Sequence, residues 1–329
     1  MSSDGQALMS TVDADVETPG APLRESDPPG GHTELTSARL ARVGDVEVRR
    51  LLPLRRRRSV GAWCFVDHYG PMSVDGVAGM QVPPHPHIGL QTVTWLLEGN
   101  VLHRDSLGSE QMIRPGQLNL MTAGHGIAHS EESPADHDPG LHGVQLWVAL
   151  PGAARQAAPA FEHHAQLPVL GIGGAEITVF TGSLAGATSP ARTFSSLVGA
   201  EINAVRGGDV TFPLTRGHEH VIFVARGSAA ANGNTLAPGS LLYLASGRGS
   251  VTLAASEGAR LFLLGGEPLG ETLLMWWNFV GRTPEDIIDA AQAWAADSGR
   301  FGEVRGYRGA PLTAPPLDPV RLARRSHGS

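Results

Sequence analysis

Hydrophobic and polar positions along this chain alternate in short stretches, and glycine or proline closes most of them. Between residues 142 and 150, for example, Val144, Leu146 and Val148 occupy every second position. A period of two indicates a β-strand, because successive side chains of a strand point to opposite faces of its sheet. The pattern therefore predicts an all-β fold of many short strands joined by turns.

The expected strands form two groups along the chain. The first group includes residues 91–97 and 117–122, and the second runs from about residue 167 to 267. A Pro-Gly pair precedes a strand in both groups, at Pro115-Gly116 and at Pro238-Gly239, which suggests an internal repeat. The strands expected in the second group are 176–181, 192–197, 209–214, 220–225, 241–245, 250–254 and 260–264.

One helix is expected near the end of the chain. Thr283 is a hydroxyl cap, Pro284 suits the first helical position, and Glu285 and Asp286 are acids in the first turn. The residues predicted to pack this helix on a barrel are Ile287, Ile288, Ala291 and Trp294.

The remaining segments set the expected domain boundaries. Residues 1–35 are too polar to offset ordering entropy, so we expect a disordered tail there, and residues 151–166 read as a linker. The predicted division is an N-terminal tail (1–35), an N-terminal metal-binding barrel (36–160), a C-terminal metal-free barrel with the closing helix (161–310) and a C-terminal tail (311–329).

Composition narrows the class of protein. The formal net charge of -7 argues against direct nucleic-acid binding, and we interpret the four arginines at 55–58 as a solvated turn rather than a phosphate site. Cys64 is the only cysteine, which excludes an intrachain disulfide. No apolar stretch reaches the ~18 residues of a membrane span, and no secretory signal is recognised. We expect a cytoplasmic protein without membrane contact, and a monomer.

Two pairs of residues of metal-binding types are each separated by two positions, the spacing of side chains on one face of a strand. His85 and His87 share one face of a strand, as do His129 and Glu131. If the two segments lie near each other in an antiparallel barrel, three imidazoles and one carboxylate converge, a set suited to a divalent first-row metal.

These segments resemble the pirin family. The resemblance rests on Pro84-His85-Pro86-His87-x-Gly89, on Leu97-Glu98-Gly99, and on Thr122-Ala-Gly-x-Gly-Ile-x-His129-x-Glu131. Pirins are bicupins, so the resemblance implies two tandem cupin (jelly-roll β-barrel) domains. It also implies a mononuclear site, usually iron, and a second barrel without metal. The ligands that it implies are His85, His87, His129 and Glu131. Many other cupins place a ligand Glu where this chain has Gln91.

Five other histidines are weaker candidates for metal ligands. His103 is expected to face outward or to lie beside a ligand, His125 to be exposed in a glycine loop or to line the mouth of the site, and His142 to be a possible partner of a ligand. His218 and His220 repeat the His-x-His spacing in the second barrel, but the strand at 241–245 offers no histidine or carboxylate.

The resemblance implies an activity of the quercetin 2,3-dioxygenase type on a flavonol or a similar small aromatic substrate. Fe(II) is the expected cofactor, with Cu, Ni, Mn or Zn as alternatives, and Glu131 would serve as ligand and catalytic base. The alternative function is an iron-dependent, redox-sensing protein that binds a regulator or an enzyme without turnover.

Overall fold

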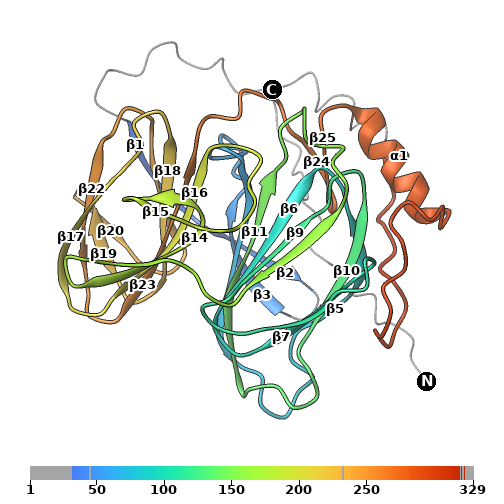
Figure 1. The fold of residues 1–329 in the computed structure, drawn as a ribbon, viewed down its shortest axis with the longest axis horizontal. Helices are drawn as coiled ribbons and strands as arrows, with labels where there is room; N and C mark the ends of the chain where they lie inside the picture. Colours follow the sequence, from blue (N-terminus) through green and yellow to red (C-terminus); the bar gives the residue numbers. More distant parts are fainter. Residues whose placement is uncertain (1–31, 44–45, 232, 319, 321, 323–329) are drawn as a thin grey trace.

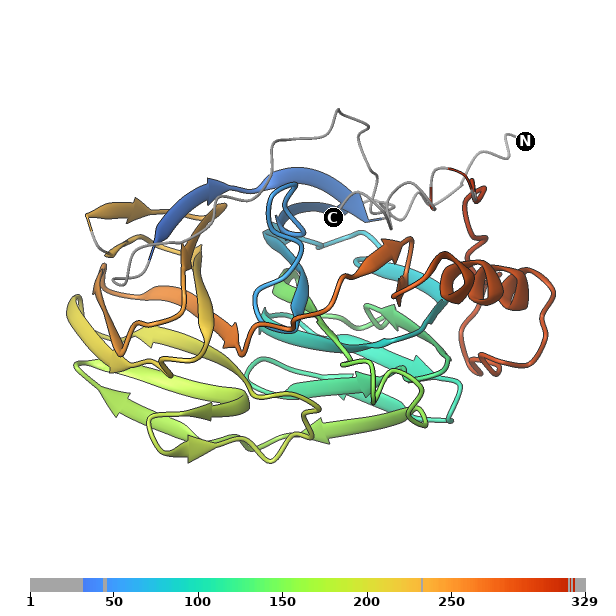
Figure 2. The same cartoon turned by 90° about the horizontal axis from the view of Figure 1, so that it is seen from above.

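The computed structural model describes residues 32–43, 46–231 and 233–318, together with 320 and 322. Two β-barrels lie side by side, with one helix at the outer edge of the N-terminal barrel (Figures 1 and 2). Every strand pairing within the barrels is antiparallel. The predicted all-β class and the pair of tandem cupin barrels are confirmed.

In the first barrel, a seven-stranded sheet packs face to face with a four-stranded sheet. The larger sheet runs in the order β12 (Ala160–His164), β9 (Leu118–Thr122), β6 (Leu90–Glu98), β11 (Gly140–Ala149), β4 (Trp63–Ser73), β3 (Val46–Leu52) and β2 (Arg39–Val43). The smaller sheet runs in the order β5 (Gln81–His87), β10 (Ile127–Glu132), β7 (Val101–Asp105) and β8 (Glu110–Ile113).

The second barrel repeats this plan with eight and four strands. Its larger sheet contains β1 (Thr33–Ser37), β21 (Ser240–Leu244), β18 (Glu219–Arg226), β23 (Ala259–Gly266), β16 (Leu197–Ala204), β14 (Ala175–Leu184) and β13 (Val169–Ile172), with β15 (Ala187–Thr188) paired to β14. Its smaller sheet contains β17 (Gly208–Pro213), β22 (Ser250–Ala255), β19 (Ala229–Ala231) and β20 (Asn234–Leu236).

The two ends of the described chain each reach the opposite barrel. β1 pairs with β21 of the second barrel, although residues 33–35 were expected in a disordered tail. The rest of that tail, residues 1–31, lies outside the described residues. At the other end, a hairpin of β24 (Leu274–Trp276) and β25 (Phe279–Gly281) lies on the first barrel, where Phe279 bridges to Ile88.

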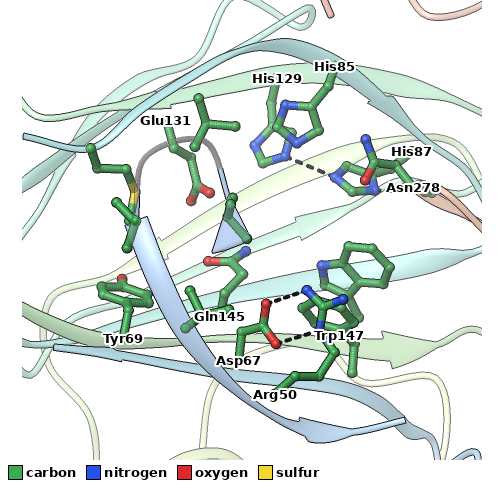
Figure 3. Close-up of a pocket in the computed structure, with 16 residues that line it drawn as sticks. Arg50, Asp67, Tyr69, His85, His87, His129, Glu131, Gln145, Trp147 and Asn278 are labelled. Atoms are coloured by element: carbon green, nitrogen blue, oxygen red, sulfur yellow. Dashed lines mark hydrogen bonds and ion pairs between the residues drawn. The ribbon is translucent and has the colours of Figure 1, made fainter. Parts of the chain in front are cut away.

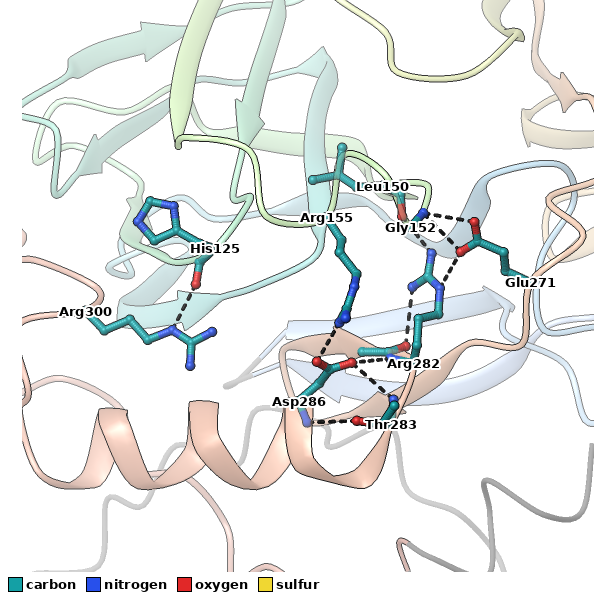
Figure 4. Close-up of polar contacts among 10 residues, drawn as sticks. His125, Leu150, Gly152, Arg155, Glu271, Arg282, Thr283, Asp286 and Arg300 are labelled. Atoms are coloured by element: carbon teal, nitrogen blue, oxygen red, sulfur yellow. Dashed lines mark hydrogen bonds and ion pairs between the residues drawn. The ribbon is translucent and has the colours of Figure 1, made fainter.

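The C-terminal helix α1 (Pro284–Ala295) packs on the first barrel rather than between the two. Thr283 caps it through a capping box with Asp286, as predicted, and Ile287 is fully buried. Figure 4 shows the tethers: Arg155 of the first barrel pairs with Asp286, and Arg282 pairs with Glu271. No described helix is long and apolar enough to cross a bilayer.

Three local predictions were wrong. The strand expected at 192–197 is instead β16, which begins at Leu197. Gly199 and the charged Glu201 interrupt the apolar pattern of this strand. Glu201 is nevertheless buried, where Trp95 and Arg260 donate hydrogen bonds to it. The sequence His68-Tyr69-Gly70-Pro71, which by its Gly-Pro pair is expected to form a turn, continues as part of β4. The linker expected at 151–166 contains β12, which pairs with β9 and belongs to the first barrel.

A shared apolar interface joins the two barrels. Trp63 and Trp95 of the first barrel and Phe180, Phe223 and Phe262 of the second belong to one buried cluster. The indole Nε1 of Trp63 donates to the carbonyl oxygens of Val198 and Gly265 across this interface. The two barrels therefore share one buried apolar cluster and are joined by hydrogen bonds.

Candidate metal centre

The predicted histidines meet because β5 and β10 are neighbours in the smaller sheet. His129 stands opposite His85, and Ile127 stands opposite His87. The ligand atoms of the three imidazoles lie within 4.8 Å of one another, and each side chain is at most 2% exposed. Figure 3 shows the three rings turned toward one another at one wall of a pocket.

Backbone carbonyls fix the tautomers of two of these histidines. Nδ1 of His85 lies 2.8 Å from the carbonyl oxygen of Pro83, and Nδ1 of His87 lies 2.9 Å from that of Asn278. A carbonyl oxygen only accepts, so each Nδ1 carries the proton, and each Nε2 presents a lone pair. Asn278 comes from the turn between β24 and β25, so the C-terminal hairpin orients a residue of the N-terminal barrel.

A chain of side chains orients the third histidine. Nε2 of His103 donates to Asp105 at 3.2 Å, which leaves Nδ1 of His103 as an acceptor. Nδ1 of His129 lies 3.4 Å from that atom and can donate to it. Phe161 of β12 stacks on His103 with ring centroids 4.5 Å apart and so holds its plane. Nε2 of His129 then also presents a lone pair.

This donor set fits a metal ion. Nε2 of His87 and Nε2 of His129 are 3.1 Å apart, and with the tautomers above neither atom carries a proton to share. Two lone pairs at that distance repel unless a cation lies beside both. Burial lowers the pKa of His85 to about 4 and also lowers the pKa values of His87 and His129, so all three are neutral, the form that binds metals.

Glu131 adjoins the three imidazoles without being part of their cluster. Its carboxylate groups with His103 and His129 instead, and Thr94 donates to it at 2.6 Å. A register shift in β10 between His129 and Glu131 separates the two positions. Burial raises the pKa of Glu131 above its ordinary value, although the hydrogen bond from Thr94 opposes this shift. The three imidazoles are thus brought together as expected, and the carboxylate lines the same pocket beside them.

The other candidate histidines lie elsewhere, apart from His103. His125 is exposed, with Nδ1 3.2 Å from the carbonyl oxygen of Ala157, and His142 pairs with His68 at 2.8 Å outside the pocket. Gln91 donates to Thr122 and to the carbonyl oxygen of Arg192, so it ties strands together. Within the described ranges, neither His218 nor His220 belongs to a group of side chains that could hold a metal.

The histidines open onto a pocket of the first barrel. Its walls combine apolar side chains, among them Val48, Phe65 and Trp147, with a few polar groups, as is typical of small-molecule sites. Across it from the histidines lie Arg50, Asp67 and Tyr69 (Figure 3). We did not anticipate these residues, although Val46, Val48 and Arg50 follow the two-residue period of one strand face.

Comparison with known proteins agrees with this geometry. The Pirin family model matches residues 45–148, and the model of the Pirin C-terminal cupin domain matches residues 199–302. A Pseudomonas aeruginosa protein provisionally named quercetin 2,3-dioxygenase is 45% identical over 88% of this chain and 93% of its own length. A Caulobacter vibrioides pirin-like protein is 37% identical over 79% of this chain and 91% of its own. The crystal structure of an Acinetobacter baumannii quercetin 2,3-dioxygenase matches with a TM-score of 0.85 at 42% identity, covering 87% of this chain and 96% of that one.

Proposed function

Since this chain belongs to the pirin family, we propose that it is a mononuclear iron dioxygenase of the quercetin 2,3-dioxygenase type. One observation carries the proposal: three buried imidazoles present converging lone pairs at the wall of a pocket that also has an aromatic side. The names of two similar proteins support the substrate class. The proposed ligands are His85, His87, His129 and Glu131.

The ligand set accounts for the expected chemistry. Three neutral imidazoles and one carboxylate would leave a divalent ion with a net charge of +1. Fe(II) held by these four residues would supply the dioxygen chemistry of non-haem iron oxygenases. The donor types do not single out iron among divalent ions. Separate samples of the protein are therefore loaded with iron, copper, nickel, manganese and zinc.

Glu131 is the proposed base for the substrate hydroxyl. Burial raises its pKa, which makes the carboxylate a better proton acceptor than an exposed glutamate. Thr94 fixes one carboxylate oxygen by donating to it at 2.6 Å. The carboxylate of Glu131 points into the pocket (Figure 3).

One wall of the pocket is aromatic and suits a flat aromatic molecule. Trp147 and Phe65 stack with their centroids 4.1 Å apart, and Trp147 meets His87 edge-on at 5.2 Å. An aromatic wall therefore runs up to the proposed metal ligands. Such a wall would orient a flavonol ring with its oxygens toward the histidines.

The test is oxygen uptake with quercetin by anaerobically metal-loaded protein. We expect uptake that requires iron and disappears in His87→Ala. The matched control is His220→Ala, the substitution of a buried histidine in the second barrel, which should leave uptake unchanged. Iron bound at one ion per chain without uptake would contradict the dioxygenase proposal, and redox-dependent binding of a partner would then become the function to test.

A further inference from the structure

A buried ion pair forms the floor of the pocket opposite the histidines. Nε and Nη2 of Arg50 donate to the two carboxylate oxygens of Asp67 at 2.8 and 2.7 Å. Arg50 is 1% exposed and Asp67 is 2% exposed. This two-point pairing orients the guanidinium and occupies two of its three nitrogens.

The third nitrogen has no partner. Among the described residues, neither Nη1 of Arg50 nor the hydroxyl of Tyr69 makes a hydrogen bond, and both atoms are buried. Both residues line the pocket. Buried donors are nearly always satisfied, because an unsatisfied one has lost its water without gaining a partner. Two such donors in residues that line one pocket mark positions where oxygens of a ligand would complete the hydrogen bonding.

We propose that Arg50 and Tyr69 form a recognition site for an oxygen of the substrate that is remote from its metal-binding oxygens. This inference rests on the proposed function and specifies its substrate class: a flat aromatic molecule with oxygens at both ends. One end meets the histidines, and the other accepts a hydrogen bond from Nη1 of Arg50.

The charge of the floor selects an uncharged oxygen. Asp67 already balances the charge of Arg50, and Glu131 adds a further carboxylate to the same pocket. A ligand carboxylate bound there would be a buried anion without its own counter-charge, which is unfavourable. A hydroxyl or carbonyl oxygen accepts the same hydrogen bond without that cost.

The aromatic wall connects the two ends of the pocket. The guanidinium carbon of Arg50 lies 4.5 Å from the ring centroid of Phe65, which stacks on Trp147, and Trp147 reaches His87. A planar ligand lying along this wall would meet the histidines with one edge and Arg50 with the other.

Anaerobic binding to iron-loaded protein tests the proposal without turnover. The two probes are quercetin and 3-hydroxyflavone. Both carry the 3-hydroxyl and the 4-carbonyl, but 3-hydroxyflavone lacks the other hydroxyls. We expect quercetin to bind about tenfold tighter or more, the range for a hydrogen bond to a charged donor.

Paired substitution keeps the test interpretable. Arg50→Met alone would strand Asp67 as a buried unpaired charge, so the variant is Arg50→Met with Asp67→Leu, which replaces the pair by apolar groups of similar volume. In it the ratio of the two dissociation constants should fall to about one. Tyr69→Phe should lower the ratio partially, since only a hydroxyl is lost. The control is Arg260→Met with Glu201→Gln, which removes a mostly buried ion pair outside the pocket and should preserve the ratio.

The outcomes separate the two proposals. Equal binding of the two probes to the unmodified protein, or an unchanged ratio in the Arg50 and Asp67 double variant, would overturn the recognition site and leave the dioxygenase proposal standing. Failure of both probes to bind iron-loaded protein would overturn both proposals.

Discussion

The two barrels share one architecture and use their interiors differently. The second barrel is filled by a cluster of 24 buried apolar residues, among them Ile177, Phe212 and Leu263. The first barrel leaves a pocket, and its wall carries buried histidines, carboxylates and an arginine. The comparison teaches that the same fold can fill its interior with apolar side chains in one copy and keep polar side chains around an internal pocket in the other.

The largest expected effect is on stability, in the second barrel. Leu263→Ala removes a fully buried side chain and should lower the free energy of unfolding by about 2–5 kcal/mol. Urea denaturation measures the loss, and Leu170→Ala, at a partly buried site, should cost less. Iron affinity of the folded variant should not change. A parallel loss of affinity would contradict the division of labour between the barrels.

The next effect is on metal affinity, in the first barrel. His103→Asn breaks the chain from Asp105 to His129 and should weaken iron binding by about 10–100-fold, the usual cost of losing a partner of a metal ligand. Titration with a competing chelator measures it. His142→Asn changes another buried histidine outside the pocket and should leave the affinity unchanged. Equal losses in the two variants would show that burial, not orientation, matters.

A third effect is the pH dependence of the metal-free protein. Burial lowers the pKa values of His85 and His220 to about 4, whereas an unfolded histidine titrates near 6.5. Between these values the unfolded chain binds more protons, so stability is complete above about pH 6.5 and falls as the pH drops toward 4.

In the metal-free protein, both barrels contribute to this dependence of the unfolding free energy on pH. Bound iron should reduce only the contribution of His85. Denaturation midpoints between pH 7 and 4.5, for the unmodified protein and for His85→Asn and His220→Asn, measure each share. Stability that stays constant across the window would be evidence against neutral buried imidazoles.

The smallest effect is at the contact between the barrels. The guanidinium of Arg57 lies 3.2 Å from the ring centroid of Tyr243 and pairs with Glu34, so the run of arginines at 55–58 is partly a contact and not only a solvated turn. Arg57→Met should cost about 0.5–1 kcal/mol. Arg56→Met, at an exposed position, serves as the control in the same thermal unfolding series. Identical melting temperatures for the two variants would remove Arg57 from the interface.

The sequence predicted the part of the site that depends on local period. A spacing of two residues placed His85 and His87 on one face, and the pairing of β5 with β10 brought His129 to them. The expectation of a second barrel without metal came from the lack of ligand residues at 241–245, and it stays a prediction.

The rest depends on contacts that no local pattern encodes. The carbonyl of Asn278 that orients His87 is 191 positions away in the chain. Likewise, β1 and β12 have few apolar residues, and their sheet pairing rather than their own sequence makes them strands. The orientation of Glu131 follows from a register shift that single-chain periodicity cannot show.

The central claim is that the first barrel alone holds the metal. The most direct test is to measure the metal content of the purified, iron-loaded protein by elemental mass spectrometry. The account predicts one ion per chain, lost in His87→Ala and retained when His218 and His220 are both replaced by alanine. Two ions per chain, or loss of iron on changing His218 and His220, would contradict it.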